Sequence, residues 1–298
     1  MLRFSRSEDP GRSTLSNEPL HHFTVDVEEW FQVSALEAAV PRSRWPDFES
    51  RVCASVELIL DLLEARGFRG TFFILGIVAE SHPDLVRRIA SGGHEVASHG
   101  WAHRRVTTLT RREFQDSVRR TRLLLQELSG QEVPGYRAPS FSITRDREWA
   151  LDVLIEEGHR YDSSLFPTRR PGYGHPDAPT RATWLERPAG QILEIPPMVL
   201  QTLGMRIPAS GGAYFRLLPY GLVRSALRQR ERLGEAGTFY IHPWELDPDQ
   251  PRVRVPTLTR IRHYGGLSRT RTRLERLLDE FRFGPMADTL EALTPRPA

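Results

Sequence analysis

The segment His94-Glu95-Val96-Ala97-Ser98-His99-Gly100-Trp101-Ala102-His103 predicts a short buried β-strand that runs into a turn with two histidines. His99 and His103 are four residues apart, and a helical turn or tight loop brings side chains at this spacing to one side of the chain. Two such imidazoles can bind one metal ion. Because the chain has 10 histidines, the pair is weak evidence by itself. A hydrolytic site also needs a carboxylate ligand, a general base and a general acid.

Strand-like and helix-like segments alternate around this segment. Helices with apolar residues at helical spacing are predicted at 51–66, 83–90, 110–128, 145–157, 219–233 and 267–281, and strands at 22–27, 70–75, 94–98, 133–136 and 238–242. Thr110 and Glu113 form a capping-box pattern at the start of one of these helices. The alternation predicts an α/β fold with parallel strands joined by right-handed crossovers.

The chain is expected to form one catalytic domain, residues 20–298, after a loose N-terminal arm at residues 1–19. Its core is predicted at about 20–165 and 235–246, and residues from about 166 to 298 are predicted to be a C-terminal extension. Prolines and glycines are dense from Pro167 to Pro208, where no helix is expected. A length of 298 residues suits one large domain with an elaboration.

Composition indicates an ordinary globular protein of a reducing compartment. The single cysteine, Cys53, excludes a disulfide within the chain. The first ten residues have no apolar core of a signal peptide, and no stretch approaches the roughly 18 apolar residues of a transmembrane helix. We therefore expect a cytoplasmic protein without a transmembrane segment.

The basic charge does not predict nucleic-acid binding. All 41 basic residues are arginines, which indicates codon bias, and they are interspersed with 38 acidic residues to a net charge of +3. The densest run, Arg260 to Arg276, is predicted to be a solvated helix face with the loop before it. The alternative is a docking patch for an anionic partner.

The run Asp26-Val27-Glu28-Glu29 supplies candidate acids. Asp26 and Glu28 share one face of a strand because side chains alternate. One of them could bind the metal while the other takes a proton from water. Glu29 is expected to point away, as a surface carboxylate.

Arg137 and His242, like Asp26 and His99, fall at or just after predicted strand ends. The carboxyl ends of parallel strands meet at one edge, where chemistry gathers in such folds. Arg137 could hold a base carboxylate ionised, or be an ordinary surface ion pair. His242 could be a general acid, or a hydrogen-bonded loop residue.

The order of these motifs resembles the polysaccharide deacetylases of the NodB type. The motifs are Thr24-Val25-Asp26, Ser98-His99-Gly100-Trp101-Ala102-His103, Arg137-Ala138-Pro139 and Ile241-His242. The resemblance covers residues from about 20 to 165 and 238 to 246. The remainder resembles the C-terminal extension of a subgroup associated with bacterial exopolysaccharide loci, through Gly211-Gly212-Ala213-Tyr214-Phe215-Arg216 and His242-Pro243-Trp244-Glu245.

The resemblance implies a distorted (β/α) barrel that binds one divalent metal ion, usually zinc, and removes acetyl groups from N-acetylated sugars. It implies that Asp26 is the base, that His99 and His103 bind the metal, that Arg137 orients the base and that His242 is the general acid. The expected substrate is an acetylated oligo- or polysaccharide of exopolysaccharide biosynthesis, or its precursor.

The sequence departs from the family pattern. Val27 occupies the position of the usual metal aspartate, so Glu28 is the expected substitute. Ser140 replaces the aromatic residue after the Arg-x-Pro motif, and Phe141 follows one position later. The acid that supports His242 is expected to be Asp162 or Glu194, with a slight preference for Asp162, although a structural role is equally plausible for each. Expected substrate-binding residues are Trp101, Pro139, Phe141, Tyr214 and Trp244.

Two other functions stay open at this point. The same fold in other relatives hydrolyses non-sugar amides or cyclic ureides. A relative with Val27 at the metal position could also be non-catalytic and only bind glycans.

Overall fold

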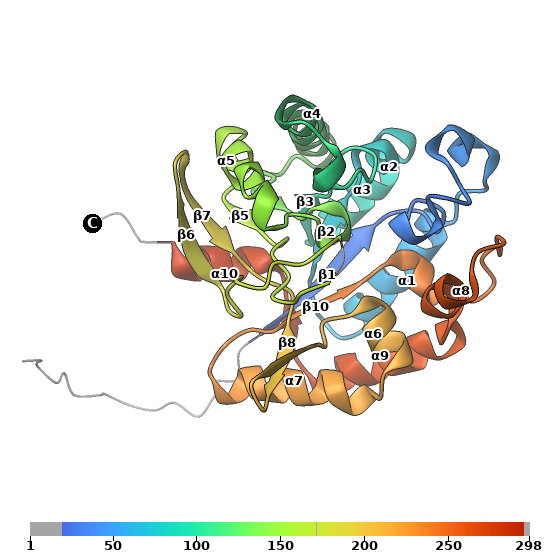
Figure 1. Cartoon of the computed structure of the whole chain (residues 1–298). Coiled ribbons are helices and arrows are strands. Elements are labelled where there is room, and N and C mark those ends of the chain that lie inside the picture. The colour runs from blue at the N-terminus through green and yellow to red at the C-terminus, as the bar shows by residue number, and fades with distance from the viewer. Residues whose placement is uncertain (1–19, 171, 295–298) are drawn as a thin grey trace, which may run out of the picture.

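The computed structural model describes residues 20–170 and 172–294, so the predicted arm at 1–19 lies outside the described residues (Figure 1). The described part contains a 9-stranded sheet. Its order is β10 (Thr238–Ile241), β1 (His21–Val27), β2 (Thr71–Ile74), β3 (Glu95–Ser98), β4 (Gly135–Tyr136), β5 (Tyr161–Asp162), β7 (Gly190–Glu194) and β6 (Thr183–Arg187), with β11 (Phe283–Gly284) paired to β1.

Parallel pairing runs from β10 through β7, and only β6 is antiparallel to its neighbour. The chain between β7 and β10 bridges the two sides of this sheet. The amide of Met198 donates to the carbonyl of Thr238 at 3.2 Å, and the amide of Tyr240 donates to the carbonyl of Ser210 at 2.7 Å. The predicted distorted (β/α) barrel is therefore confirmed, and its parallel strands place their carboxyl ends at one edge.

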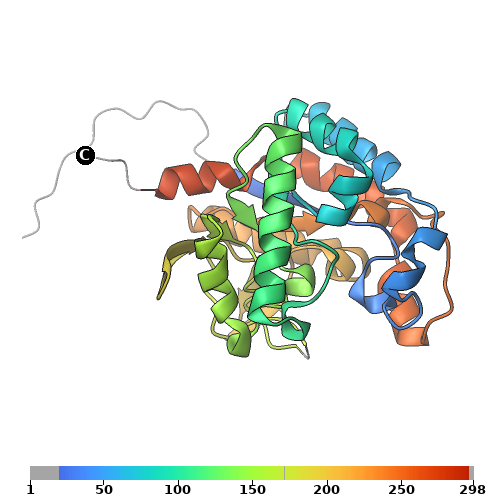
Figure 2. The same cartoon turned by 90° about the horizontal axis from the view of Figure 1, so that it is seen from above.

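Helices surround the sheet (Figures 1 and 2). The first half contributes α1 (Val52–Glu64), α2 (Gly76–Ser81), α3 (Pro83–Ser91), α4 (Arg111–Ser129) and α5 (Trp149–Glu156). The second half contributes the hairpin β8 (Val199–Thr202) and β9 (Met205–Pro208), then α6 (Gly212–Leu217), α7 (Tyr220–Arg232), α8 (Thr257–Tyr264), α9 (Leu267–Glu280) and α10 (Met286–Leu293). Within the ranges that the structure describes, no helix is long and apolar enough to cross a membrane.

The long helices were predictable because their apolar residues recur at helical spacing and, in α4, because a capping box marks the start of the helix. At the start of α4, the Thr110 hydroxyl accepts from the Glu113 amide at 3.3 Å, and the Glu113 carboxylate accepts from the Thr110 amide at 2.9 Å. This confirms the capping box. The short helices α2, α6, α8 and α10 were not predicted, because segments of six to eight residues show a weak periodic pattern at best.

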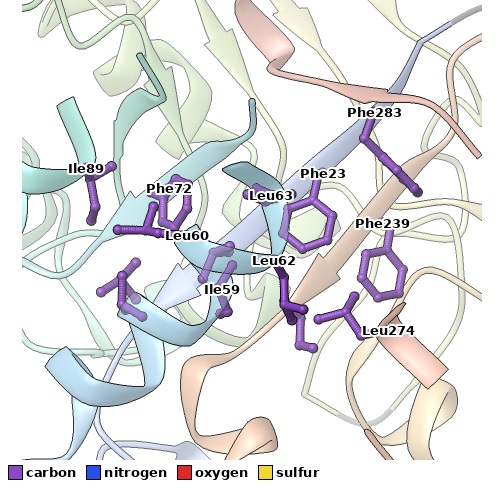
Figure 3. Packing of buried hydrophobic residues seen from close by; sticks show 14 of the residues in the cluster. Phe23, Ile59, Leu60, Leu62, Leu63, Phe72, Ile89, Phe239, Leu274 and Phe283 are labelled. Atoms are coloured by element: carbon purple, nitrogen blue, oxygen red, sulfur yellow. The ribbon is translucent and has the colours of Figure 1, made fainter. Parts of the chain in front are cut away.

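The core joins the first and second halves of the chain. Figure 3 shows Phe23 of β1 and Phe239 of β10 packed beside Phe283, with side chains of α1 and α9 against them. The Phe23 ring centroid lies 5.8 Å from that of Phe239 and 5.7 Å from that of Phe283. This packing holds β1 between β10 and β2, and it thereby fixes the positions of Asp26 near the end of the strand and of Glu28 just after it.

A close contact between β4 and β5 gives a test of the packing. A Cβ added at Gly135 would lie 2.1 Å from the Tyr161 hydroxyl oxygen, so Gly135→Ala must displace a buried ring. We expect a loss of about 1–3 kcal/mol in the free energy of unfolding, measured by urea titration. Gly221→Ala in α7, where the added Cβ meets nothing within 4 Å, is the control. Equal stability of the two variants would contradict this packing.

Candidate metal centre and active site

The carboxyl ends of β1, β3, β4 and β10 bring the predicted catalytic side chains together. Asp26 lies near the end of β1 and Glu28 just after it, while His99 follows β3 and His242 follows β10. These residues and His103 line one pocket with a cavity volume of about 360 Å³. Arg137, after β4, lies fully buried behind Asp26. The sheet thus gathers residues that are more than 200 positions apart in the sequence.

Glu28, His99 and His103 form a group that could hold a metal ion. Their ligand atoms all lie within 4.8 Å of one another, and all three residues are buried. The Glu28 Oε2 atom lies 2.8 Å from His103 Nε2. One carboxylate and two imidazoles, with room in the pocket for water, match the donor set of hydrolytic zinc sites. Val27 has no donor atom for a metal, and the Glu28 carboxylate is the acid that lies beside the two histidines.

His99 is oriented for ligation by its backbone surroundings. Its Nδ1 donates to the carbonyl of Arg137 at 2.8 Å, which leaves the lone pair of Nε2 available to a metal. Burial, with a contribution from His103, lowers the pKa of His99 to about 4. The ring is therefore neutral near pH 7, as a metal ligand must be.

The acid of this group is ionised. Burial alone would raise the pKa of Glu28, but the nearby His103, His242 and His99 outweigh it and lower the pKa to about 2. A carboxylate and a neutral imidazole in a buried site are ligands ready for a cation. The His103 Nδ1 atom is buried without a hydrogen-bond partner in the described part of the chain.

Arg137 fixes the second carboxylate. Its Nη1 donates to Asp26 at 2.7 Å and to the Thr24 hydroxyl at 2.8 Å, and its Nη2 donates to the Ser163 hydroxyl at 2.9 Å. Thr24 and Asp26 share one face of β1, so a single guanidinium nitrogen reaches both. The guanidinium carbon lies 4.1 Å from the centroid of the Phe73 ring. Arg137 therefore has one orientation, and Asp26 has one carboxylate oxygen directed to the pocket side.

His242 is held between carboxylates. Its Nδ1 donates to Glu245 at 2.6 Å, and its Nε2 lies 3.8 Å from Asp26 Oδ2 and 3.7 Å from Glu28 Oε1. Burial lowers the pKa of His242, but the Glu245 hydrogen bond and the charges of Glu28 and Asp26 raise it to about 9. The buried Arg216 donates from Nε to Glu245 at 2.5 Å and so fixes that carboxylate. The ring is a proton donor at neutral pH.

Trp244 connects the two sides of the site. Its ring stacks on His242, with centroids 5.1 Å apart, and on His263, with centroids 4.4 Å apart. Its Nε1 donates to Glu28 Oε1 at 3.1 Å. This hydrogen bond leaves Glu28 Oε2 directed at His103, so Trp244 orients a candidate metal ligand.

The prediction that Asp162 or Glu194 supports His242 is wrong, because Glu245 holds His242 Nδ1. Asp162 and Glu194 face each other across β5 and β7 and are fully buried. Asp162 accepts from the Ser164 hydroxyl at 2.5 Å, and Glu194 accepts from the Leu165 amide at 3.1 Å. Burial raises the pKa of Asp162 to about 6, and burial together with Asp162 raises the pKa of Glu194 further. Burial of these two facing carboxyl groups in the wall of the barrel therefore favours their protonated forms.

The expected substrate-binding residues divide into two groups. Phe141, Tyr214 and Trp244 line the pocket. Trp101 and Pro139 do not, and these two predictions are wrong. The Trp101 ring packs against Gly76 and lies under the Arg120 guanidinium, 3.3 Å from the ring centroid. Pro139 is buried at the start of a tight turn and accepts a hydrogen bond from the Ser142 hydroxyl.

Strand alternation predicted that Glu29 is a surface carboxylate, and this prediction is wrong. Glu29 is buried and accepts from the amides of Arg51 and Val52 at the start of α1. An acid suits this place because helix N-termini carry unpaired amides and a partial positive charge. β1 ends at Val27, so the alternation of side chains along the strand no longer determines where Glu29 points.

Sequence reasoning also missed Glu245, Arg216, Tyr173 and Tyr240. His242 and Glu245 are three apart and form a capping-box pair in the turn Pro243–Leu246, a spacing that could have indicated the contact. Tyr173 and Tyr214 hydroxyls lie 2.9 Å apart at the pocket, and Tyr240 lines it from β10. The hydrogen bond from Arg216 to Glu245 joins residues 29 positions apart, and no short sequence pattern indicates it.

Backbone strain is concentrated at this pocket. His103, Ser140 and Phe141 all line it and have positive φ values of 49°, 56° and 51°. Residues other than glycine rarely adopt this conformation, and it persists where surrounding contacts enforce it, commonly at functional sites. The Ser140 hydroxyl lies 2.9 Å from that of Ser34, which ties the strained turn to the segment after β1.

Two families match separate parts of this chain. Residues 48–154 match the polysaccharide deacetylases, and residues 163–291 match a domain of unknown function, DUF3473. The chain is 32% identical over 95 residues to a peptidoglycan-N-acetylglucosamine deacetylase of Bacillus cereus, an overlap of 32% of the chain and 34% of that relative. The chain spans about a third of the length of the curated relatives that it matches first.

Solved structures show the same fold. A candidate polysaccharide deacetylase from Mycobacterium smegmatis is 20% identical with a TM-score of 0.63, covering 98% of both chains. The allantoinase Puue is 16% identical with a TM-score of 0.62, covering 99% of this chain and 100% of its own. At these identities the similarity establishes the fold and does not establish the substrate.

The Trp244 contact predicts a change in metal affinity. Trp244→Phe keeps an aromatic ring between His242 and His263 but removes the donor to Glu28. We expect the dissociation constant for zinc to rise about tenfold or more, measured by competition with a chromophoric chelator. Trp184→Phe removes an indole donor to the Leu293 carbonyl, far from the site, and should leave the constant unchanged. Unchanged affinity in Trp244→Phe would contradict the orienting role.

The Asp162–Glu194 pair predicts a pH dependence of stability. Its raised pKa values mean that the folded state binds protons more tightly than the unfolded state. Below pH 4, near the pKa values of the two carboxyl groups in the unfolded chain, the pair makes its full contribution to the free energy of unfolding. This contribution is lost as the pH rises through the higher pKa values of the folded state. Glu194→Gln removes one of the two titrating carboxyl groups and the charge that faces Asp162, and it should flatten the decline in the free energy of unfolding above pH 5, measured in urea. The exposed Glu186→Gln should keep the wild-type slope, and an unchanged slope in Glu194→Gln would refute the raised pKa of the pair.

Proposed function

We propose that this chain, whose residues 48–154 match the polysaccharide deacetylases, is a metal-dependent hydrolase that removes N-acetyl groups from an acetylated sugar polymer or its precursor. The observation that carries the proposal is the convergence of a buried acid–imidazole group with a separate acid and a separate histidine in one pocket. Amide hydrolysis needs these parts: a cation site, a proton acceptor and a proton donor.

Glu28, His99 and His103 would hold one divalent metal ion, and their donor atoms favour zinc. When bound, the ion would supply Lewis-acid polarisation of the acetamide and a more acidic water. The residues fit this ion because His99 is neutral, Glu28 is ionised and both are oriented by hydrogen bonds from outside the group.

Asp26 is the proposed general base. Its Oδ1 accepts from Arg137, while its Oδ2 faces His242 across 3.8 Å of the pocket. A water between Asp26 and the substrate carbonyl can transfer its proton to Oδ2 as the oxygen attacks the carbonyl carbon. Arg137 keeps the carboxylate in place before and after this transfer, because its other donors are bound to Thr24 and Ser163.

His242 is the proposed general acid. Its Nε2 faces the pocket and its Nδ1 is bound to Glu245, so the proton leaves from Nε2 to the departing sugar nitrogen. Glu245 stabilises the charged ring before transfer, and Arg216 keeps Glu245 from moving. The C–N bond then breaks, acetate forms on the side of Asp26, and the amine leaves through the pocket mouth.

Aromatic side chains support a sugar substrate. Phe141, Tyr214 and Trp244 line the pocket together with Tyr173 and Tyr240, and such rings pack against the apolar faces of sugars.

We further propose action in the cytoplasm on an exopolysaccharide or its precursor, which follows from the subgroup resemblance of residues 166–298. Hydrolysis of a non-sugar amide or ureide is the second candidate, favoured by the shared fold with an allantoinase.

The assignment of the base is tested by Asp26→Asn. Acetate release from N-acetylated oligosaccharides by the zinc-loaded protein should fall about a hundredfold or more, because the amide cannot accept the proton. Zinc content should stay near that of wild type, since the proposed ligands are unchanged. Asp84→Asn, at a highly exposed position, is the matched control and should retain full activity.

The same assay separates the competing functions. Release of acetate from oligosaccharides, set beside turnover of small amides and cyclic ureides, identifies the substrate class. A protein that binds no zinc and releases no acetate would overturn the enzyme proposal and favour a glycan-binding relative. Near-normal turnover in Asp26→Asn would show that another residue is the base.

A further inference from the structure

A basic and apolar surface borders the mouth of the pocket. It consists of the segment from Arg252 to Arg262, which includes most of α8 (Figure 1). Thr259 and Arg262 line the pocket. Leu258 and Ile261 are 70% and 50% exposed. We call this segment the 252–262 surface.

Its positive charge is not neutralised within the described ranges. Arg252, Arg254, Arg260 and Arg262 are exposed, none of them forms an ion pair, and residues 251–264 contain no acidic residue. Some exposed arginines elsewhere face a carboxylate, as in Arg44 with Asp47, Arg111 with Glu156 and Arg120 with Glu80, whereas Arg112 and Arg232 have none within ion-pair distance in the described ranges. The 252–262 surface differs because four such cations lie within one short segment that contains no acidic residue.

Aliphatic side chains lie among these cations. Leu258 and Ile261 are three apart on α8 and project from the same side. Leu217, 38% exposed at the end of α6, lies next to Gly265 just after α8. Within the described ranges, Leu258 and Ile261 keep at least half of their surface open to solvent. Large exposed aliphatic residues surrounded by unpaired arginines are typical of helices that lie in a lipid interface.

The inner side of the same segment is firmly anchored. His263 and Tyr264 are buried, and the Tyr264 hydroxyl accepts from the Val253 amide at 3.0 Å. The Arg262 carbonyl accepts from Arg216 at 2.8 Å. Arg216 also holds Glu245 in the site, so the surface has a fixed position relative to the pocket.

We propose that the 252–262 surface docks the protein on an anionic lipid bilayer. The guanidinium groups bind lipid phosphates and the negative surface charge, while Leu258 and Ile261 enter the boundary of the acyl chains. A nucleic acid would use the arginines but would leave both aliphatic side chains in water, so the bilayer accounts for more of the surface. The pocket mouth then opens beside the membrane, and, resting on the proposed function, its glycan is presented there by a lipid-borne carrier.

Vesicle sedimentation of the full chain tests the docking. Phosphatidylcholine vesicles, with and without phosphatidylglycerol, are mixed with wild type, with the charge variant Arg254→Glu/Arg260→Glu and with the apolar variant Leu258→Ser/Ile261→Ser. We expect wild type to partition at least about tenfold more strongly to the anionic vesicles. Each double variant should lower that partition coefficient about tenfold or more.

Matched controls separate this surface from general basicity and stickiness. Arg112→Glu/Arg232→Glu reverses two exposed arginines elsewhere, and Leu123→Ser/Leu233→Ser removes two exposed leucines elsewhere. Both controls should bind anionic vesicles like wild type, and circular dichroism melts verify that all variants fold. The proposal would be overturned if wild type bound neutral and anionic vesicles equally. It would also be overturned if the control variants lost as much binding as the surface variants, or if Leu258→Ser/Ile261→Ser had no effect on binding. Vesicle binding requires neither metal nor acetylated sugar, so its failure and a failure of the hydrolase assay are distinguishable.

Discussion

The buried guanidinium of Arg137 is the interaction on which the pocket depends. Its side chain binds Asp26 and Thr24 of β1 and Ser163 after β5, while its own carbonyl accepts from His99. One residue therefore positions a carboxylate and an imidazole that come from different strands. A fully buried cation is stable only when paired and hydrogen-bonded, and here every interaction that satisfies it also orders the site.

The second half of the chain supplies part of the site. β10 pairs with β1, and the chain after it supplies His242, Trp244 and Glu245. Trp244 hydrogen-bonds to Glu28, and Arg216 fixes Glu245, so the segment matched by the domain of unknown function reaches the candidate ligands. One sheet and one pocket are thus shared by both matched regions, because β1 lies between β2 and β10.

Local patterns predicted what depends on local geometry. Strand alternation placed Asp26 and Glu28 in one pocket, and the spacing of His99 and His103 indicated a shared ligand group, which the structure brings together. The same reasoning failed for Glu29, which lies two residues beyond the end of β1 and accepts from the amides at the start of α1. The expectations for Trp101, Asp162 and Glu194 came from the family resemblance, and they failed because the Trp101 ring packs against α2 and α4 and the two acids face each other.

The amino-acid sequence by itself determined the alternation of strands and helices, the α/β fold, the resemblance to the polysaccharide deacetylases and the residue types able to do the chemistry. These follow from periodicity and from motifs within a few residues of one another. Only the tertiary structure decided which acid holds His242, which side chain orients Glu28 and which aromatic rings enter the pocket. Those contacts join residues from separate elements, and their distances depend on strand register and packing that no local pattern encodes.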